Sequence, residues 1–265
     1  MGIKAEDYFS SSNRYLSNSK ISKYLELPSY FKALYIDKVM KQLESTSLKK
    51  GKAVDVFITD SKAAFLEQYE RKVLKRENAE LFEMQKDPNY SKTLMNETEW
   101  KQSLGMINAL KSHSMFNKMK SYTAQQILSY DKKLNDNWDG FCGIPDWFKI
   151  EGDVCHIVDL KTARTVSTAR SWFYKCKEYN YFNQFAMYSM LLKKNYPEIK
   201  SFTYTHWIVK NSYPNLMRVF KIDPSIVERA KLDLKVAIKK IGEDTQFVDP
   251  EITETIEDYE EKGAE

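Results

Sequence analysis

The sequence contains few cysteines and no long apolar run. Three of its 265 residues are cysteine (Cys142, Cys155 and Cys176), an odd number without C-x-x-C spacing. This pattern supports neither a disulfide framework nor a zinc knuckle. The opening residues lack the apolar stretch of a secretory signal, and no apolar run approaches the length of a membrane span. We therefore expect a protein of the reducing cytoplasm, without a membrane partner.

An overall excess of charge of one sign is also absent, because 41 Lys and Arg stand against 37 Asp and Glu, a formal net charge of +4. With 42% apolar and 29% charged residues, the chain is neither disordered nor fibrous. The charges are unevenly distributed, however. Residues 249–265 hold eight acids and one base, so this segment carries −7 and residues 1–248 carry +11. A basic part of this charge can attract nucleic acid or an anionic membrane, and of these we expect nucleic acid; the acidic tail is expected to dock a partner protein or compete with DNA.

The hydrophobic pattern divides the chain into a helical front, residues 15–120, and a catalytic core, residues 121–241, in which strands and helices alternate. Within the front, the polar stretch 75–97 has little periodicity and is typical of a mobile loop. We expect one α/β domain over residues 1–248, with a central mixed sheet flanked by helices, followed by the acidic tail. The expected strands are 124–133, 138–150, 154–161, 200–210 and 216–222, and the expected core helices are 166–177, 180–195 and 224–241.

Two aspartates and a lysine form the most informative pattern. Asp159 and Lys161 are two residues apart in an expected strand, so they share one face of the sheet. Residues 151–153 form a turn-like triplet, and a hairpin centred there places Asp146 nearly opposite Asp159. Gln184 and Tyr188, four residues apart, share a helix face that can cover this patch.

Paired carboxylates repel unless a cation lies between them, and their hard oxygen atoms suit Mg²⁺ or Mn²⁺. Such a cation can activate water and neutralise the charge that develops on a phosphodiester. Asp146 and Asp159 are therefore candidate metal ligands, and Lys161 is a candidate for contacting the water and the phosphate. The pattern predicts phosphodiester hydrolysis.

The same residues resemble the PD-(D/E)xK nuclease superfamily, with Pro145-Asp146 and Asp159-Leu160-Lys161 as its two motifs. Gln184-x-x-x-Tyr188 is similar to the branch that includes RecE, the YqaJ-type phage exonucleases such as lambda exonuclease, and the RecB nuclease domain. RecE-like phage recombination exonucleases are the most similar within it. The resemblance covers roughly residues 15–210 and extends to Ser17-x-Ser19-x-Ile21, Leu27-Pro28 with Phe31, Gly51-x-Ala53-x-Asp55 and Asp159-Leu160-Lys161-Thr162.

The resemblance implies a restriction-endonuclease-like fold and a 5′ to 3′ exonuclease on ends of linear double-stranded DNA, leaving 3′ single strands for annealing-type recombination. It further implies two Mg²⁺ or Mn²⁺ ions per site, a homo-oligomeric ring, and a phage single-strand annealing protein as partner in the host cytoplasm. Gln184 and Tyr188 would position the strand or support the lysine. The Leu160 carbonyl would ligate metal, and Asp55 stands where the family usually has a histidine ligand.

Several readings stay open. Asp55 is as well explained by a helix-end partner of lysines as by metal ligation, and His206, without a partner at ligand spacing, is expected to be structural. A RecB-like nuclease for single strands or flaps would share every motif residue, and loss of the histidine ligand would fit a catalytically inactive DNA-binding scaffold. Candidate DNA-binding residues, each also compatible with an ordinary surface or capping role, are Arg14, Ser19, Lys20, Arg164 and Arg170.

Overall fold

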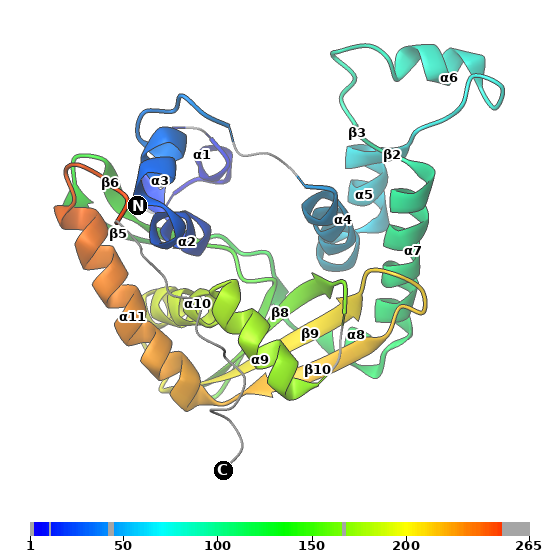
Figure 1. The fold of residues 1–265 in the computed structure, drawn as a ribbon. Coiled ribbons are helices and arrows are strands. Elements are labelled where there is room, and N and C mark those ends of the chain that lie inside the picture. The colour runs from blue at the N-terminus through cyan, green and yellow to red at the C-terminus, as the bar shows by residue number, and fades with distance from the viewer. Residues whose placement is uncertain (1–2, 11, 42–44, 166–167, 251–265) are drawn as a thin grey trace, which may run out of the picture.

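A five-stranded mixed sheet forms the centre of the protein in the computed structural model, which describes residues 3–10, 12–41, 45–165 and 168–250 (Figure 1). The strand order is β10-β9-β8-β7-β4. The β8 and β9 strands run parallel, whereas the other neighbouring pairs are antiparallel, as expected of a mixed sheet. The strand bounds are Thr123–Ala124 (β4), Trp147–Glu151 (β7), Val154–Ala163 (β8), Ser201–Lys210 (β9) and Met217–Ile222 (β10).

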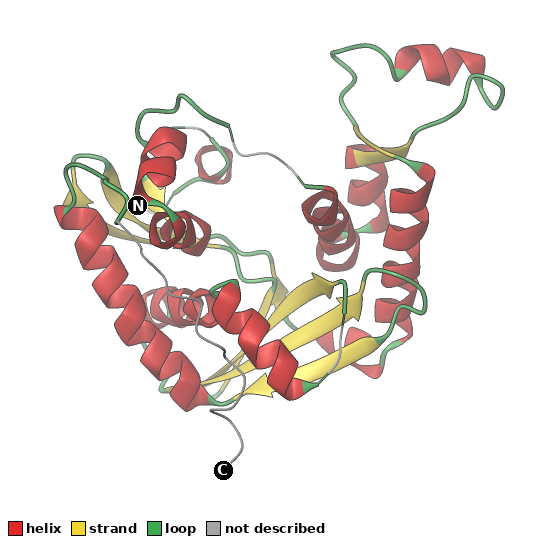
Figure 2. Cartoon of the chain, viewed as in Figure 1, coloured by secondary structure: helices red, strands yellow, loops and turns green. Residues whose placement is uncertain are grey.

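Helices cover both faces of this sheet, which confirms the α/β fold class (Figure 2). Successive side chains of β8 enter different cores: Ile157 packs on the side of α10, and Val158 packs on the side of α4. The expected core helices are present. On the α10 side lie α9 (Ala169–Glu178), α10 (Tyr181–Asn195) and α11 (Pro224–Glu243), and on the α4 side lie α4 (Thr46–Asp55), α5 (Lys62–Gln68), α7 (Glu97–Ser112) and α8 (Ser114–Met119).

The expectation of one strand over 138–150 is wrong. The chain bends at residues 144–146 and divides into β6 (Trp138–Gly143) and β7, which belong to different sheets. Pro145, which lacks a backbone N–H, lies in this bend. The expected strand 124–133 is likewise divided between β4 and β5. A second sheet has the order β1-β6-β5 and lies beside three helices; these elements are β1 (Tyr15–Leu16), β5 (Leu128–Asn135), α1 (Ala5–Tyr8), α2 (Asn18–Glu26) and α3 (Pro28–Tyr35).

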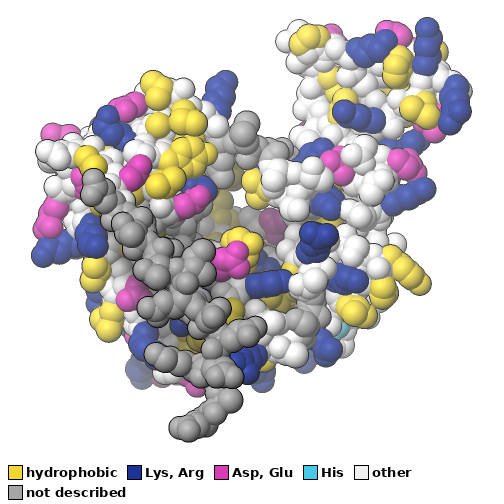
Figure 3. Space-filling view, viewed as in Figure 1, with side chains coloured by type: hydrophobic (Ala, Val, Ile, Leu, Met, Phe, Trp, Pro, Cys, Tyr) yellow, Lys and Arg dark blue, Asp and Glu magenta, His cyan; other side chains and the backbone are white. Residues whose placement is uncertain are grey.

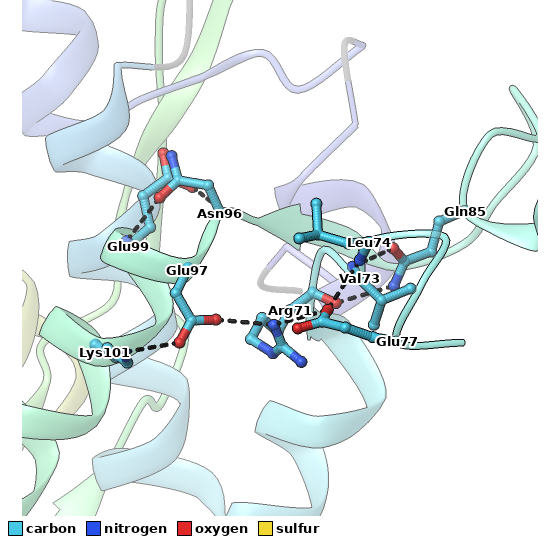
Figure 4. Close-up of polar contacts among 9 residues, drawn as sticks. All are labelled: Arg71, Val73, Leu74, Glu77, Gln85, Asn96, Glu97, Glu99 and Lys101. Carbon is cyan, nitrogen blue, oxygen red and sulfur yellow. Dashed lines mark hydrogen bonds and ion pairs between the residues drawn. The ribbon is translucent and has the colours of Figure 1, made fainter. Parts of the chain in front are cut away.

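The stretch expected to be a mobile loop, 75–97, is an arm with its own structure that projects from the body (Figure 1). It contains α6 (Ala79–Met84) and β3 (Thr93–Met95), and β3 pairs in parallel with β2 (Tyr69–Arg71). Arg71 bridges the carboxylates of Glu77 and Glu97, which lie far apart in the sequence (Figure 4). The amide of Gln85 donates to the Arg71 carbonyl and accepts from the Val73 N–H. The arm is held by these polar contacts and not by a periodic apolar face. The hydrophobic pattern of the sequence therefore did not predict it.

The surface is hollowed between the part that carries α2 and α3 and the part that carries α4 (Figure 3). No helix within the described ranges is long and apolar enough to cross a membrane. The three cysteines are free and buried. The acidic tail lies outside the described residues except for residues 249 and 250, and Asp249 accepts hydrogen bonds from the backbone and hydroxyl of Ser29.

Candidate active site

The hairpin of β7 and β8 brings the two motif aspartates together. Trp147 pairs with Val158, so the register continues directly to Asp146 and Asp159, as the turn at 151–153 predicted. Asp146 lies in the bend just before β7, where its Oδ2 accepts a hydrogen bond of 2.6 Å from the Leu160 backbone N–H. The bend and the β8 strand are therefore fixed to each other at the motif residues.

Lys161 and Asp159 lie on the α10 side of the sheet. The Lys161 Nζ is 2.6 Å from Asp159 Oδ2 and donates a 2.9 Å hydrogen bond to Gln184 Oε1. The Gln184 amide in turn donates to the Tyr188 hydroxyl at 2.7 Å. The predicted helix face thus covers the predicted strand face. A further contact comes from Tyr181, whose ring centroid is 4.7 Å from the ammonium.

Asp55 reaches the same site from the other side of the sheet. It is the last residue of α4 and is followed by a π-helical turn, η1 (Val56–Asp60), a type of irregularity that is frequent at functional sites. Gly51 lets α4 approach β8, because a Cβ at this position would be 3.3 Å from Thr162 Oγ1. The side-chain amide of Gln125 donates to Asp55 Oδ2 at 3.0 Å and to Asp146 Oδ1 at 3.4 Å.

Burial raises the pKa of all three carboxyls, because a charge is poorly solvated there. For Asp55 the raised pKa is about 7, with repulsion from Asp159 adding to burial, and with Lys161 and the Gln125 amide opposing both. The pKa of Asp146 is raised well above its usual range by burial and by Asp55 and Asp159. The pKa of Asp159 is raised by burial, and Lys161 opposes the shift. The three carboxyls are therefore harder to ionise here than in water, and Lys161 is the charged group that opposes the shift of each.

Lys161 responds in the opposite direction. Burial lowers the pKa of its ammonium, but the attraction of Asp159 and Asp146 raises it more, so the pKa lies above its usual value and the lysine stays charged. Lys161 therefore serves as a fixed cation and hydrogen-bond donor.

His206 is a contact that the sequence did not reveal. It is fully buried on β9 in register with Asp159, with Nε2 3.7 Å from Asp159 Oδ2. Its Nδ1 accepts a 3.0 Å hydrogen bond from Trp172 Nε1. Burial and Lys161 lower the pKa of His206 well below its usual value, so the ring is neutral and carries its proton on Nε2, facing Asp159. Gln125 was also missed as a site contact, and nothing in its spacing from the motifs indicated it.

The donor chemistry fits a hard divalent cation. Asp55 Oδ1 and Asp159 Oδ1 are buried oxygens that have no hydrogen-bond partner within the described part of the chain. Oxygen donors of this kind suit Mg²⁺ or Mn²⁺, and a cation would relieve the carboxylate repulsion. In the described ranges, no group of three or more His, Cys, Asp or Glu side chains is already arranged to hold a metal ion. The Lys161 ammonium and the Gln125 amide instead occupy part of the carboxylate oxygens, namely those of Asp159 and of the Asp55–Asp146 pair.

The candidate DNA-binding residues are not all free to bind phosphate. Lys20 Nζ donates to the carbonyls of Asn13 and Tyr15 at 2.8 Å each, and burial lowers its pKa to about 8. Arg14 bonds the Asp136 carbonyl and the Asp139 carboxylate of the β5–β6 hairpin. The Ser19 hydroxyl shares a hydrogen bond with Ser17 Oγ. The two remaining candidates, Arg164 and Arg170, are exposed beyond the end of β8 and in the first turn of α9.

Residues 17–259 match a family described as "PDDEXK-like domain of unknown function (DUF3799)". A crystal structure from Eubacterium rectale, described as "Putative exonuclease", superimposes with a TM-score of 0.63 at 17% sequence identity, covering 92% of this chain and 89% of that one. A structure of SSO0001 covers 82% of this chain and 84% of that one at 12% identity, with a TM-score of 0.30. No curated protein sequence matches significantly. The family model agrees with the predicted PD-(D/E)xK superfamily, and the first structure shows that the two chains share a fold.

Proposed function

The chain belongs to the PDDEXK-like family that its residues 17–259 match, and from this premise we propose that it is a metal-dependent DNA exonuclease. One observation carries the proposal: Asp146, Asp159 and Lys161 converge at the β7–β8 hairpin, with Gln184 bonded to the lysine. Two carboxylates and a charged amine in this arrangement match the needs of phosphodiester hydrolysis.

In this proposal, the carboxylates bind metal, and Lys161 contacts the phosphate or the water. Asp146, Asp159 and Asp55 would hold Mg²⁺ or Mn²⁺, with the Leu160 carbonyl as a further ligand and two ions in all. A bound ion of this kind supplies charge stabilisation at the phosphate and a more acidic water. Lys161, held charged by the aspartates, donates to a phosphate oxygen or orients the attacking water. Gln184 keeps the ammonium directed at the reacting group, and the Tyr188 hydroxyl fixes the orientation of the Gln184 amide.

The test is digestion of linear plasmid DNA with Mg²⁺ or Mn²⁺, by wild type, Asp159→Asn and Lys161→Ala, with EDTA as control. We expect each substitution to lower the rate at least about 100-fold. A second readout is thermal: Mg²⁺ or Mn²⁺ should raise the Tm of the wild type and change that of Asp159→Asn far less. Linear DNA left intact by the wild type with both metals would refute the proposal, and full activity of Asp159→Asn would refute the site.

The finer activity, 5′ to 3′ digestion of double-stranded ends to leave 3′ single strands, is supported by the RecE-like motifs. DNA labelled at the 5′ or the 3′ end gives the polarity. Comparing duplex ends with single strands and flaps separates this activity from a RecB-like one. DNA binding that survives Asp159→Asn, without metal-dependent degradation by the wild type, would instead identify an inactive scaffold.

We also propose, on the same motifs, a homo-oligomeric ring that threads DNA and transfers its product to a phage single-strand annealing protein in the host cytoplasm. Ring closure would explain processive digestion, because the DNA could not leave sideways. Mass photometry of the protein at nanomolar concentration tests the ring, and a monomer that digests processively would contradict it. Candidate annealing proteins can be tested for stable complexes with the exonuclease.

A further inference from the structure

A groove of about 990 Å³ lies between β5, α10, α11 and the beginning of β9. None of the candidate active-site residues lines it. The proposed nuclease activity therefore gives this groove no role, and its chemistry can be considered separately.

The groove combines an apolar floor with a basic rim. Met187, Met190, Phe202 and Ile238 are among its apolar lining residues. Seven lysines line it against one acid, Glu228. A surface of this composition suits an occupant that is apolar on one side and acidic on the other.

Three of the seven lysines are available to such an occupant. Lys132 on β5, Lys194 on α10 and Lys235 on α11 are exposed. In the described ranges of the chain, none of the three has an acidic partner within ion-pair distance, and the Lys194 ammonium lies 4.9 Å from the Tyr130 ring centroid. These three lysines come from three different elements, so together they surround the groove.

The chain carries a segment with the complementary pattern. Residues 251–265 contain seven acids and one base. Their apolar residues Ile252, Ile256 and Tyr259 are spaced by four and three positions, which is the spacing of one face of a helix. A helix with a single apolar face at this spacing is a common occupant of a hydrophobic groove, and the carboxylates of this segment complement the lysines of the rim.

The segment also matches the groove in length. Before it, Phe247 packs against Phe31 at 5.9 Å between ring centroids, and Asp249 binds Ser29, so the chain is fixed up to that point. The groove follows α11 from Pro224 to Lys239, about 22 Å at the helical rise per residue. Fifteen residues in a helix are likewise about 22 Å long. We propose that residues 251–265 dock into the groove of their own chain, with the apolar face on its floor and the carboxylates on its lysines.

Zero-length carbodiimide cross-linking of the full chain tests this directly, because it joins only carboxylates and amines in contact. Mass spectrometry should find links from residues 254–261 to Lys132, Lys194 or Lys235 in protein that runs as a monomer. Links confined to lysines elsewhere, or no links from the segment, would overturn the proposal. Groove links found only in cross-linked dimers would overturn it as well, because the occupant would then belong to a second copy.

A second measurement uses a fluorophore on Ala264→Cys, since the native cysteines are buried. Charge reversal by Lys132→Glu, Lys194→Glu and Lys235→Glu together should lower the fluorescence anisotropy to the value seen in 0.5 M salt. The matched control reverses three exposed lysines elsewhere, at positions 62, 75 and 118, and should leave the anisotropy unchanged. An equal fall in both variants, or none in the groove variant, would contradict docking. The proposal does not depend on nuclease activity.

Discussion

The Leu160 backbone N–H donates a 2.6 Å hydrogen bond to the carboxylate of Asp146. It joins the bend before β7 to the strand that carries Asp159 and Lys161. Because one oxygen of Asp146 is held in this way and the other lies 3.4 Å from the Gln125 amide, the carboxylate has a defined orientation before any cation binds. The motif residues are thus positioned by the backbone of the hairpin and by their neighbours.

Gln184 should matter for rate more than for stability. Gln184→Leu removes the acceptor that directs the Lys161 ammonium, so we expect kcat to fall by about 10- to 100-fold with a small change in KM. Tyr188→Phe leaves Gln184 in place but removes the partner of its amide, and it should lower kcat in the same direction by less. Steady-state kinetics on labelled DNA measures both, and a larger loss in Tyr188→Phe than in Gln184→Leu would contradict this order of roles.

The raised pKa of Asp55 predicts a pH-dependent stability without metal. Its folded pKa of about 7 exceeds the usual 3.8, so the folded state binds a proton that the unfolded state releases. The stability gained from that proton is present in full below about pH 4 and is lost as the pH rises to about 7. In EDTA, Asp55→Asn should therefore have a Tm equal to the wild type at low pH and higher by roughly 8 °C at pH 8. Asp60→Asn, at an exposed position, is the control, and a constant Tm difference for Asp55→Asn across this range would refute the shift.

His206 and Trp172 should act as a unit. The Trp172 indole donates to Nδ1, which leaves the Nε2 proton directed at Asp159. His206→Phe leaves a buried indole N–H without a partner and should cost about 1–3 kcal/mol of unfolding free energy. Trp172→Phe removes that donor, so the double variant should lose less stability than the sum of the single variants. Denaturant unfolding of the four proteins gives the coupling energy, and strict additivity would mean that the hydrogen bond contributes nothing.

The close approach of α4 to β8 should control the position of Asp55. Gly51→Val introduces a side chain where even a Cβ lies 3.3 Å from Thr162 Oγ1, so α4 must shift and activity should fall by about tenfold or more. Gly51→Ala also gains about 1 kcal/mol of helix propensity, so its stability should hardly change while its activity falls. Combining Gly51→Ala with Thr162→Ala removes the opposing oxygen and should restore activity. Nuclease rates and Tm values of the three variants check this, and an inactive double variant would contradict the steric argument.

The sequence by itself predicted the chemistry of the hairpin. The positions of Asp146 and Asp159 relative to the turn determine their register, because strand pairing across a short turn leaves no freedom. The periodic segments likewise determined α10, α11, β9 and β10 to within a few residues. These features depend on residues that are close in the sequence, so the local sequence is enough to predict them.

The tertiary structure alone decided which distant segments meet. Asp159 and His206 are brought together by the parallel pairing of β8 and β9, whose connection contains two helices. Gln125 reaches Asp55 across 70 residues of sequence. Lys20, a candidate DNA-binding residue, instead donates to backbone carbonyls of its own chain. The break between β6 and β7 is also a tertiary feature, because the two halves of residues 138–150 pair with strands of different sheets. Such contacts depend on the packing of the whole chain, because the native fold is the one in which burial and hydrogen bonding are satisfied at all positions together. The hydrophobic pattern of one segment does not contain this information.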